Sequence, residues 1–393
     1  MWSDLNEWFW SERIWLRPDA KWADLEDRDG KVFPHPRDLL AALPLALALV
    51  ALRFAFERFI ALPIGHWLGI QNQPRRPAKP IPTLERYFVT VGPKPKEDQL
   101  EFLAAVCKLT LNQTRRWFRR RRNQDRIPLG KKFREASWRF TYFLFISLAG
   151  FSILYHEPWL WRPVMCWDNY PHQSLKPSLY YWYLLELSFF TSLFITAPLD
   201  IKRKDFKEQM LHHTVTILLI FFSYSTNLIR VGSLVMLPLD CTNSFLEIAK
   251  IFSYTKYQKV SQVLFFIFAL VFLSLRMVIF PTQILYTTYY DSIDGTGPFF
   301  GYYFFNILLM MIQVLQTFWS YLIVRMLYNF NWKGKVGRDI RSDVEESDSS
   351  DSEVVEKNPP LQDGVAHRPG ATTSDGPRSR ATTNQNTCGP RSR

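Results

Sequence analysis

The sequence is poor in cysteine. Its 393 residues include four cysteines, Cys107, Cys166, Cys241 and Cys388, and no C-x-x-C pair. Structural zinc sites and disulfide frameworks are recognised by closely and regularly spaced cysteines. We therefore expect neither, and the fold must be held together by packing and hydrogen bonds.

We also expect no cleavable signal peptide, because the N-terminal region is polar up to Arg37. Tryptophan is typical of the membrane–water interface, and this region contains Trp2, Trp8, Trp10, Trp15 and Trp22. We expect residues 1–37 to form an interfacial segment. The apolar run at 38–60 should remain as the first membrane anchor.

The mean hydropathy is only −0.11, but polar blocks at 65–136 and 332–393 dilute long apolar runs. A run of about 20 apolar residues is long enough to cross a bilayer as a helix. The expected fold is therefore an all-α polytopic membrane protein with about seven transmembrane helices. These are predicted at 39–60, 137–155, 178–198, 211–229, 231–249, 260–286 and 300–327.

Basic residues are unevenly shared among the connecting loops. Lysine and arginine are absent from 287–299, whereas 61–136, 199–210 and 250–259 are rich in them. Because cytosolic loops carry the excess of Lys and Arg, this alternation predicts a lumenal N-terminus, a cytosolic C-terminus and an odd number of spans. The 231–249 span is kept for this reason, although it contains Pro238 and Asp240.

A soluble cytosolic insert is predicted at 75–128. It has three candidate helices, near Thr83–Phe88, at Glu97–Cys107 and after Thr110, which is a plausible N-cap. The third candidate resembles the recognition helix of a homeodomain, most clearly at Trp117, Phe118, Arg121 and Arg122.

The adenine-reading asparagine of a homeodomain is replaced here by Arg120. A guanidinium group cannot reproduce the asparagine–adenine pair. Two interpretations stay open for the insert: a basic structural module beside anionic lipid headgroups, and a DNA-binding module. The first is favoured, and any DNA binding is not expected to be sequence-specific.

The segment 333–393 has the composition of a disordered cytosolic tail. It contains an acidic serine cluster that suits an acidophilic kinase, at Ser342, Ser347, Ser349, Ser350 and Ser352. A tail that only increases solubility is an equally good interpretation.

Ionisable residues gather in two adjacent predicted spans. His212 and His213 follow a basic loop, and Asp240, Asn243 and Glu247 share one face of the next helix at spacings of three and four residues. With the turn between these spans near Arg230, a rise of about 1.5 Å per residue brings Glu247 level with the histidines and Asp240 deeper. Ionisable groups at membrane depth usually face a cavity.

Imidazole suits general acid–base work near neutral pH and can carry an acyl group. Neighbouring residues on a helix point about 100° apart, so the two histidines should have different roles. A metal site is a second interpretation, although adjacent histidines do not present two ligands on one face. A third interpretation is that these groups only pack helices together.

The stretch D-I-K-R-K-D-F-K-E-Q-x-x-H-H from Asp200, followed by an aspartate and L-E-x-A-K, resembles the Lag1 motif of the ceramide synthase family. W-A-D-L-E-D-R-D-G from Trp22 and F-F-G-Y-Y-F-F-N from Phe299 are also similar to that family, as is I-R-S-D-V-E-E-S-D-S-S in the tail. The similarity extends over nearly the whole chain.

The resemblance implies an enzyme of the endoplasmic reticulum membrane that N-acylates a sphingoid base with a fatty acyl-CoA and needs no cofactor. It implies catalysis by His212 and His213 with Asp240, supported by position 243 and Glu247. Membrane lipids and a second ceramide synthase, as a homo- or hetero-dimer, are the partners expected. The phosphates of acyl-CoA are expected at Lys202, Arg203, Lys204 and Lys207, and acyl length should be selected at Tyr289, Asp291, Asp294 and Pro298.

Two positions depart from the family pattern H-D-x-x-D-x-x-x-E. Leu239 stands in place of the histidine, and Asn243 stands in place of the second carboxylate. Asparagine can neither act as a base nor balance an imidazolium. We therefore keep three hypotheses: a ceramide synthase of full or reduced activity, an impaired paralogue that modulates other ceramide synthases, and a membrane-tethered DNA-binding regulator.

Overall fold

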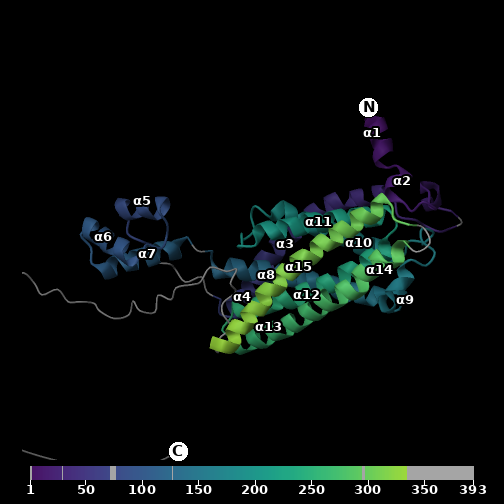
Figure 1. The fold of residues 1–393 in the computed structure, drawn as a ribbon. Helices are drawn as coiled ribbons and strands as arrows, with labels where there is room; N and C mark the ends of the chain where they lie inside the picture. Colours follow the sequence, from purple (N-terminus) through teal and green to yellow (C-terminus); the bar gives the residue numbers. More distant parts are fainter. Residues whose placement is uncertain (1, 29, 71–76, 126, 294–296, 334–393) are drawn as a thin grey trace, which may run out of the picture. The chain divides into compact units, whose positions relative to one another are not determined.

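The computed structural model describes residues 2–28, 30–70, 77–125, 127–293 and 297–333. Regular structure within these ranges is helical, apart from one isolated bridge between Arg28 and Lys31 (Figure 1). The tail from residue 334, with its predicted phosphorylation sites, lies outside the described residues.

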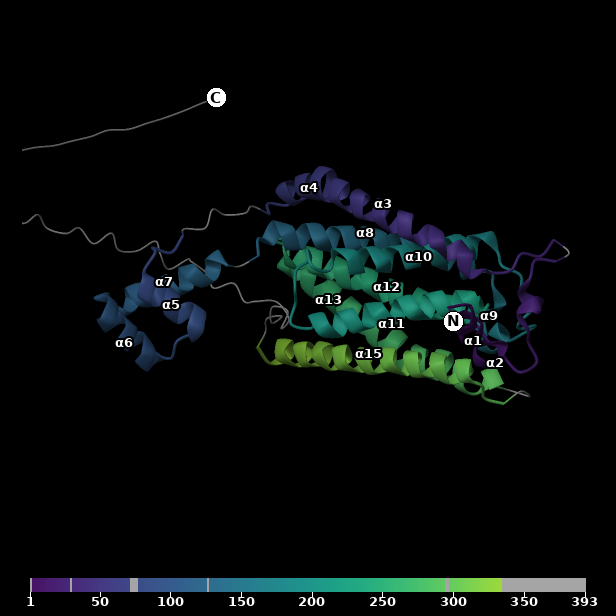
Figure 2. The same ribbon diagram turned by 90° about the horizontal axis from the view of Figure 1, so that it is seen from above.

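Each apolar run predicted from the sequence falls on a long helix or on consecutive helical segments, and these run alongside one another (Figures 1 and 2). They are α3 (Ala42–Phe56) continued by η3 (Glu57–Ala61) and α4 (Leu62–Trp67), then α8 (Leu129–Leu154), α10 (Pro177–Thr196), α11 (Phe206–Ser225), α12 (Ile229–Ser253), α13 (Gln258–Phe272) continued by η5 (Leu273–Leu285) and α14 (Tyr286–Tyr289), and α15 (Phe300–Lys333).

Four helical stretches of the described chain are long and apolar enough to cross a membrane: Pro36–Trp67, Gln258–Ile293, Phe300–Asn329 and, within the range Leu111–Leu154, the helix α8. Helices α10, α11 and α12 each contain 20 residues or more. At about 1.5 Å per residue these three helices are also long enough to cross a membrane. They are less apolar than the four stretches above because they carry the glutamate, histidine and aspartate side chains described below. The chain is thus a helical membrane protein with several apolar helices.

Helix α12 occupies the centre of the bundle and packs most extensively against α8 and α13 (Figure 2). The turn that leads into it lies at Asn227, which has φ 56° and is three residues from Arg230, near which the sequence predicts the turn. Asparagine tolerates this left-handed conformation better than most residues. Its side-chain amide donates hydrogen bonds to the backbone carbonyls of Pro171 and Gln173, 2.7 and 2.9 Å away, which holds the turn in place.

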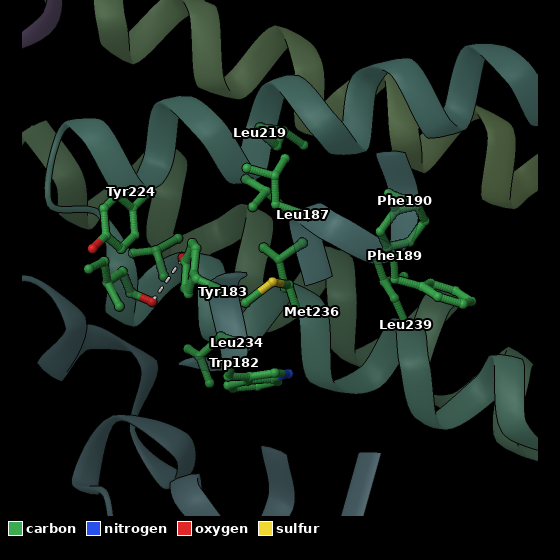
Figure 3. Close-up of a cluster of buried hydrophobic side chains, with 14 of the residues drawn as sticks. Trp182, Tyr183, Leu187, Phe189, Phe190, Leu219, Tyr224, Leu234, Met236 and Leu239 are labelled. Atoms are coloured by element: carbon green, nitrogen blue, oxygen red, sulfur yellow. Dashed lines mark hydrogen bonds between the residues drawn. The ribbon is translucent and has the colours of Figure 1, made fainter. Parts of the chain in front are cut away.

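Helices α10 and α12 approach closely where Tyr183 meets Gly232. Tyr183 is fully buried among the apolar side chains of the core (Figure 3). Its hydroxyl group donates a hydrogen bond to the carbonyl of Ile229 at 3.2 Å. A Cβ atom on Gly232 would lie only 1.9 Å from that hydroxyl oxygen. The glycine is required here because a side chain would occupy the same space as the tyrosine.

The N-terminal region packs against the helical bundle. It contains α1 (Trp2–Phe9), α2 (Glu12–Trp15), η1 (Trp22–Leu25) and η2 (Pro36–Ala41). Trp15 is 3% exposed and stacks on Phe222 of α11, with ring centroids 4.5 Å apart. Trp8, in contrast, is 65% exposed. The tryptophans therefore divide between core packing and the surface.

Buried ion pairs fasten the first apolar helix to the segment after α10. The Arg53 guanidinium group donates to Asp200 at 2.6 Å and to Thr196 at 2.9 Å. Arg139 of α8 donates to the other oxygen of Asp200 at 2.9 Å. Because removing one partner leaves a buried charge uncompensated, this cluster fixes the start of the basic loop.

The predicted insert forms a three-helix unit with its own core, built from α5 (Pro82–Thr90), α6 (Glu97–Cys107) and α7 (Leu111–Gln124). Thr110 caps α7 as expected, since its hydroxyl group accepts a hydrogen bond from the Gln113 backbone. Trp117 and Phe118 are buried in this core. Arg121 pairs with Glu85 and holds the pKa of that carboxyl group below its usual value, chiefly through their hydrogen bond.

Candidate active site

A cavity runs between α10, α11, α12 and α15 and encloses about 960 Å³, part of it open to the outside. Its lining follows one face of α11 through His212, Thr216, Leu219 and Ser223. At a rise of about 1.5 Å per residue, the eleven steps from His212 to Ser223 correspond to about 16 Å of length. This length suits an extended ligand.

The polar side chains that line the cavity gather toward its two ends. Near the start of α11 are His212, Glu186, Asp240 and Asn243, contributed by three different helices. The far end holds Arg17, Trp167, Thr288, Ser292 and Asn306. Between them the wall consists mainly of apolar side chains, such as Leu219, Val231, Val235 and Leu309. The cavity therefore joins a group of ionisable residues to an apolar channel.

The two adjacent histidines have different surroundings. His212 lines the cavity and packs edge-on against Trp319, with ring centroids 5.6 Å apart. Trp319 is held in turn by its indole N–H, which donates to Asp205 at 3.1 Å. His213 is not among the described residues that line the cavity. It packs against Phe190 at 5.7 Å and faces the charges of Arg139 and Asp200.

The polar face of α12 is also divided. Asp240, 2% exposed, and Asn243 line the cavity. Glu247 instead pairs with Lys250 at 2.5 Å, and the charges of Arg139 and Arg203 lie near it. Of the three residues predicted to share one face, Glu247 therefore belongs to a charged cluster and not to the cavity wall.

Comparison with known proteins places the chain in a family. The model of the TLC domain matches residues 132–325. The chain is 61% identical to ceramide synthase 4 of Homo sapiens and 58% identical to that of Bos taurus, in each case over 97% of this chain and 97% of the relative. It is 42% identical to ceramide synthase 5 of Homo sapiens over 90% of both chains. The chain belongs to the ceramide synthase family.

A buried arginine that sequence reasoning missed occupies the site of this family member. Arg276 of η5 is 4% exposed and donates hydrogen bonds to Thr242 Oγ1 at 2.6 Å, to the Leu239 carbonyl at 2.8 Å and to Asn243 Oδ1 at 2.8 Å. Both departures from the ceramide synthase pattern thus contact one guanidinium group. Asn243 retains the acceptor oxygen that a carboxylate would offer, without its charge.

Glu186 of α10 is a second residue that the sequence analysis missed. It is fully buried from the outside, lines the cavity and lies against the carboxyl group of Asp240. A signal was available, because Glu186 is the one acidic residue in the predicted span 178–198. A lone ionisable residue in a span marks a functional site by default.

The basic loop lies at the α10–α11 connection, close in sequence to the histidines. Lys202, Lys204 and Lys207 are exposed and Arg203 is half-buried. None of these four side chains is among the described residues that line the cavity. Exposed cations at this position are suited to a polyanion outside the cavity and not to a group within it.

The predicted acyl-length residues lie beside the far end of the cavity but do not form its wall. Tyr289 and Pro298 are exposed, Asp291 is half-buried, and Asp294 is outside the described residues. The wall is made by Thr288, Ser292, Phe299 and Tyr302. The Tyr302 hydroxyl group donates to the Tyr289 carbonyl at 3.2 Å, so the two sets are connected.

The described part of the chain contains no set of side chains that would support the metal-site interpretation. No group of three or more His, Cys, Asp or Glu side chains there is arranged to hold a metal ion. His212, Asp240 and Glu186 come from separate helices and meet around the cavity.

Proposed function

We propose that this ceramide synthase transfers the acyl group of a long-chain fatty acyl-CoA to the amine of a sphingoid base within the cavity, and that His212 carries the acyl group. The observation that carries the proposal is the junction of His212 and Asp240 with an apolar channel. The identity to ceramide synthases over nearly the whole chain supports the same reaction. The apolar channel is suited to the hydrocarbon chains of both substrates.

The proposed roles follow from the surroundings of each residue. His212 faces the cavity and is the nucleophile, since imidazole can form a covalent acyl intermediate. Asp240 provides a carboxylate near the imidazolium that develops. His213 lies outside the cavity wall, between Phe190 and the charges of Arg139 and Asp200. Its role is to position the start of α11.

The proposed topology has seven membrane-crossing helices in the endoplasmic reticulum, with a lumenal N-terminus and a cytosolic C-terminus. The basic loops at 61–136, 199–210 and 250–259 support it, because Lys and Arg mark the cytosolic side. In this orientation the ionisable end of the cavity faces the cytosol. Lys202, Arg203, Lys204 and Lys207 can then bind the phosphates of acyl-CoA as charge-assisted partners.

Acyl length is proposed to be selected at the lumenal end of the cavity. The predicted residues Tyr289, Asp291, Asp294 and Pro298 act through the wall residues Thr288, Ser292, Phe299 and Tyr302. The hydrogen bond between Tyr302 of the wall and Tyr289 of the loop supports this link between the loop residues and the wall residues. A shift in the loop would move the end of the channel and so change the longest chain that fits.

The second candidate function, an impaired paralogue, rests on Leu239 and Asn243. The hydrogen bond from Arg276 to Asn243 favours reduced over abolished activity, because the polar network at this position is still complete.

For the insert we propose a structural module at the membrane surface. Burial of Trp117 and Phe118, and the ion pairs of Arg121 to Glu85 and Asp125, support packing roles for these residues. Dimer formation and DNA binding remain predictions.

The test uses microsomes from cells that lack other ceramide synthases and compares the unmodified chain with His212→Ala and His213→Ala. Loss of the acyl carrier should lower ceramide formation by more than about 1,000-fold in His212→Ala, by comparison with the loss of a catalytic-triad member. His213→Ala should retain measurable turnover at equal protein level. Background ceramide from the unmodified chain would instead support the impaired paralogue, and full activity of His212→Ala would refute the proposed mechanism.

A further inference from the structure

Glu186 is the one carboxyl group at the ionisable end of the cavity that the mechanism above does not use. It projects from α10, opposite the α12 residue Asp240, and its side chain is 0% exposed. Both of its carboxyl oxygens and Asp240 Oδ2 lack a well-formed hydrogen bond among the described residues, although the two carboxyl groups and the Trp182 side chain lie close to one another. A buried carboxyl group without a donor is costly, so these three oxygens point to a ligand that supplies donors.

The sphingoid base supplies such donors. Its amine reaches the site as an ammonium group with three N–H donors, as the lysine ammonium has. Ammonium is also the group that acyl transfer must deprotonate, because only a neutral amine has a lone pair for attack. An acceptor for this proton has to lie within the cavity, close to the acyl carbon.

We propose that Glu186 and Asp240 together form a carboxyl pair that binds the sphingoid ammonium group and accepts its proton. The proposal rests on the acyl transfer proposed above. Two carboxyl groups in contact within a dry site cannot both be ionised, so the pair holds one proton and can take up a second. This supplies the second carboxyl group that position 243 lacks in this chain.

The proton balance of the reaction is as follows. The acyl carbon–sulfur bond breaks when His212 attacks, and the CoA thiolate leaves with the electron pair. The carboxyl pair takes one proton from the ammonium group, and the neutral amine then attacks the acyl carbon. The carbon–imidazole bond breaks, its electron pair returns to His212, and the new amide nitrogen loses its second proton. Of these two protons, one ends on the CoA thiolate and the other leaves to water.

Other titratable groups surround the pair and set its charge. They come from each packed element: His212 on α11, Cys241 on α12, Arg276 on η5 and Tyr142 on α8. Arg276 donates hydrogen bonds to the Leu239 carbonyl and to Asn243 Oδ1, and so places a positive charge on the Asp240 side of the pair.

The test measures the pH dependence of ceramide synthesis by the full chain in microsomes from cells lacking other ceramide synthases. Glu186→Gln keeps the size of the side chain but cannot accept a proton. We expect its kcat to fall by at least about 100-fold, the usual range for loss of a general base, with little change in KM for acyl-CoA. The acid limb of the kcat profile should flatten. Glu186→Asp should retain part of the rate and keep an acid limb at a displaced pH.

The matched control is Glu157→Gln, at a glutamate that pairs with Lys176 outside the cavity, and it should behave as the unmodified chain. Equal rates and pH profiles for Glu186→Gln and the unmodified chain would overturn this inference and leave the proposed function intact. A lack of ceramide from the unmodified chain would refute the proposed function instead. If the Glu186→Gln protein does not accumulate, the Glu186→Asp variant serves as the test. A full rate and an unchanged pH profile of kcat in Glu186→Asp would then overturn the inference.

Discussion

At the scale of single residues, the site is organised by which side chains reach the cavity. His212 and His213 are adjacent in the sequence, yet only the first lines the wall in the described chain. The helical angle of about 100° between neighbours predicts that they differ. It does not say which one faces the cavity, because that depends on the packing of α10 and α15 around α11.

Asn243→Asp is the residue-scale prediction. The new carboxylate would accept from Arg276 in the place of Asn243 Oδ1, 2.8 Å away, and would restore the family's charge beside the cavity. We expect kcat to rise several-fold, equivalent to about 1 kcal/mol in the barrier. The rate of microsomal ceramide synthesis, normalised to protein level, measures this rise in kcat. The companion variant Asn243→Leu removes the acceptor and should lower protein accumulation. If Asn243→Asp is no faster than the unmodified chain, the asparagine does not limit turnover.

At the scale of elements, the contact between Tyr183 of α10 and Gly232 of α12 shapes part of the cavity wall. Tyr183 and Gly232 both line it, and the tyrosine hydroxyl group fills the space above the glycine. Helix lengths and apolar faces follow from the sequence pattern. The contact between Tyr183 and Gly232 cannot be predicted from that pattern, because the pattern does not indicate which residue of α10 lies opposite a given residue of α12.

Gly232→Ala is the element-scale prediction. Although alanine favours helix formation, its Cβ would collide with Tyr183, and overpacking of this kind costs about 1–3 kcal/mol. We expect a lower thermal midpoint in detergent and lower ceramide synthesis. Tyr183→Phe should partly rescue the variant, since the nearest remaining ring atom lies 3.0 Å from the added carbon.

The matched control for that experiment is Gly65→Ala, where the added carbon would meet the Phe133 ring at 3.3 Å. Its effect on the thermal midpoint should be small. An equal shift for both glycine variants, with no rescue by Tyr183→Phe, would show that the Tyr183 contact is not the cause.

At the scale of the whole molecule, the sequence predicts the helices well and their mutual contacts poorly. The apolar runs, the Thr110 cap and the Lag1-like stretch all identify elements that the structure contains. Being the lone charge in its span marks Glu186 and Arg276 as candidates, but the sequence pattern does not show that both meet α12, because that is a long-range contact. The tryptophan content near the N-terminus does not predict that Trp15 stacks on Phe222 of α11, which is also a long-range contact.

The central claim is that His212 carries the acyl group at the junction of the ionisable groups and the apolar channel. The most direct measurement is peptide mass spectrometry of the purified full chain after exposure to fatty acyl-CoA without a sphingoid base. The account predicts an acyl adduct on His212 that persists in His213→Ala, is absent in His212→Ala and disappears when sphinganine is added. An adduct on His213, or one on His212 that sphinganine does not discharge, would contradict the account.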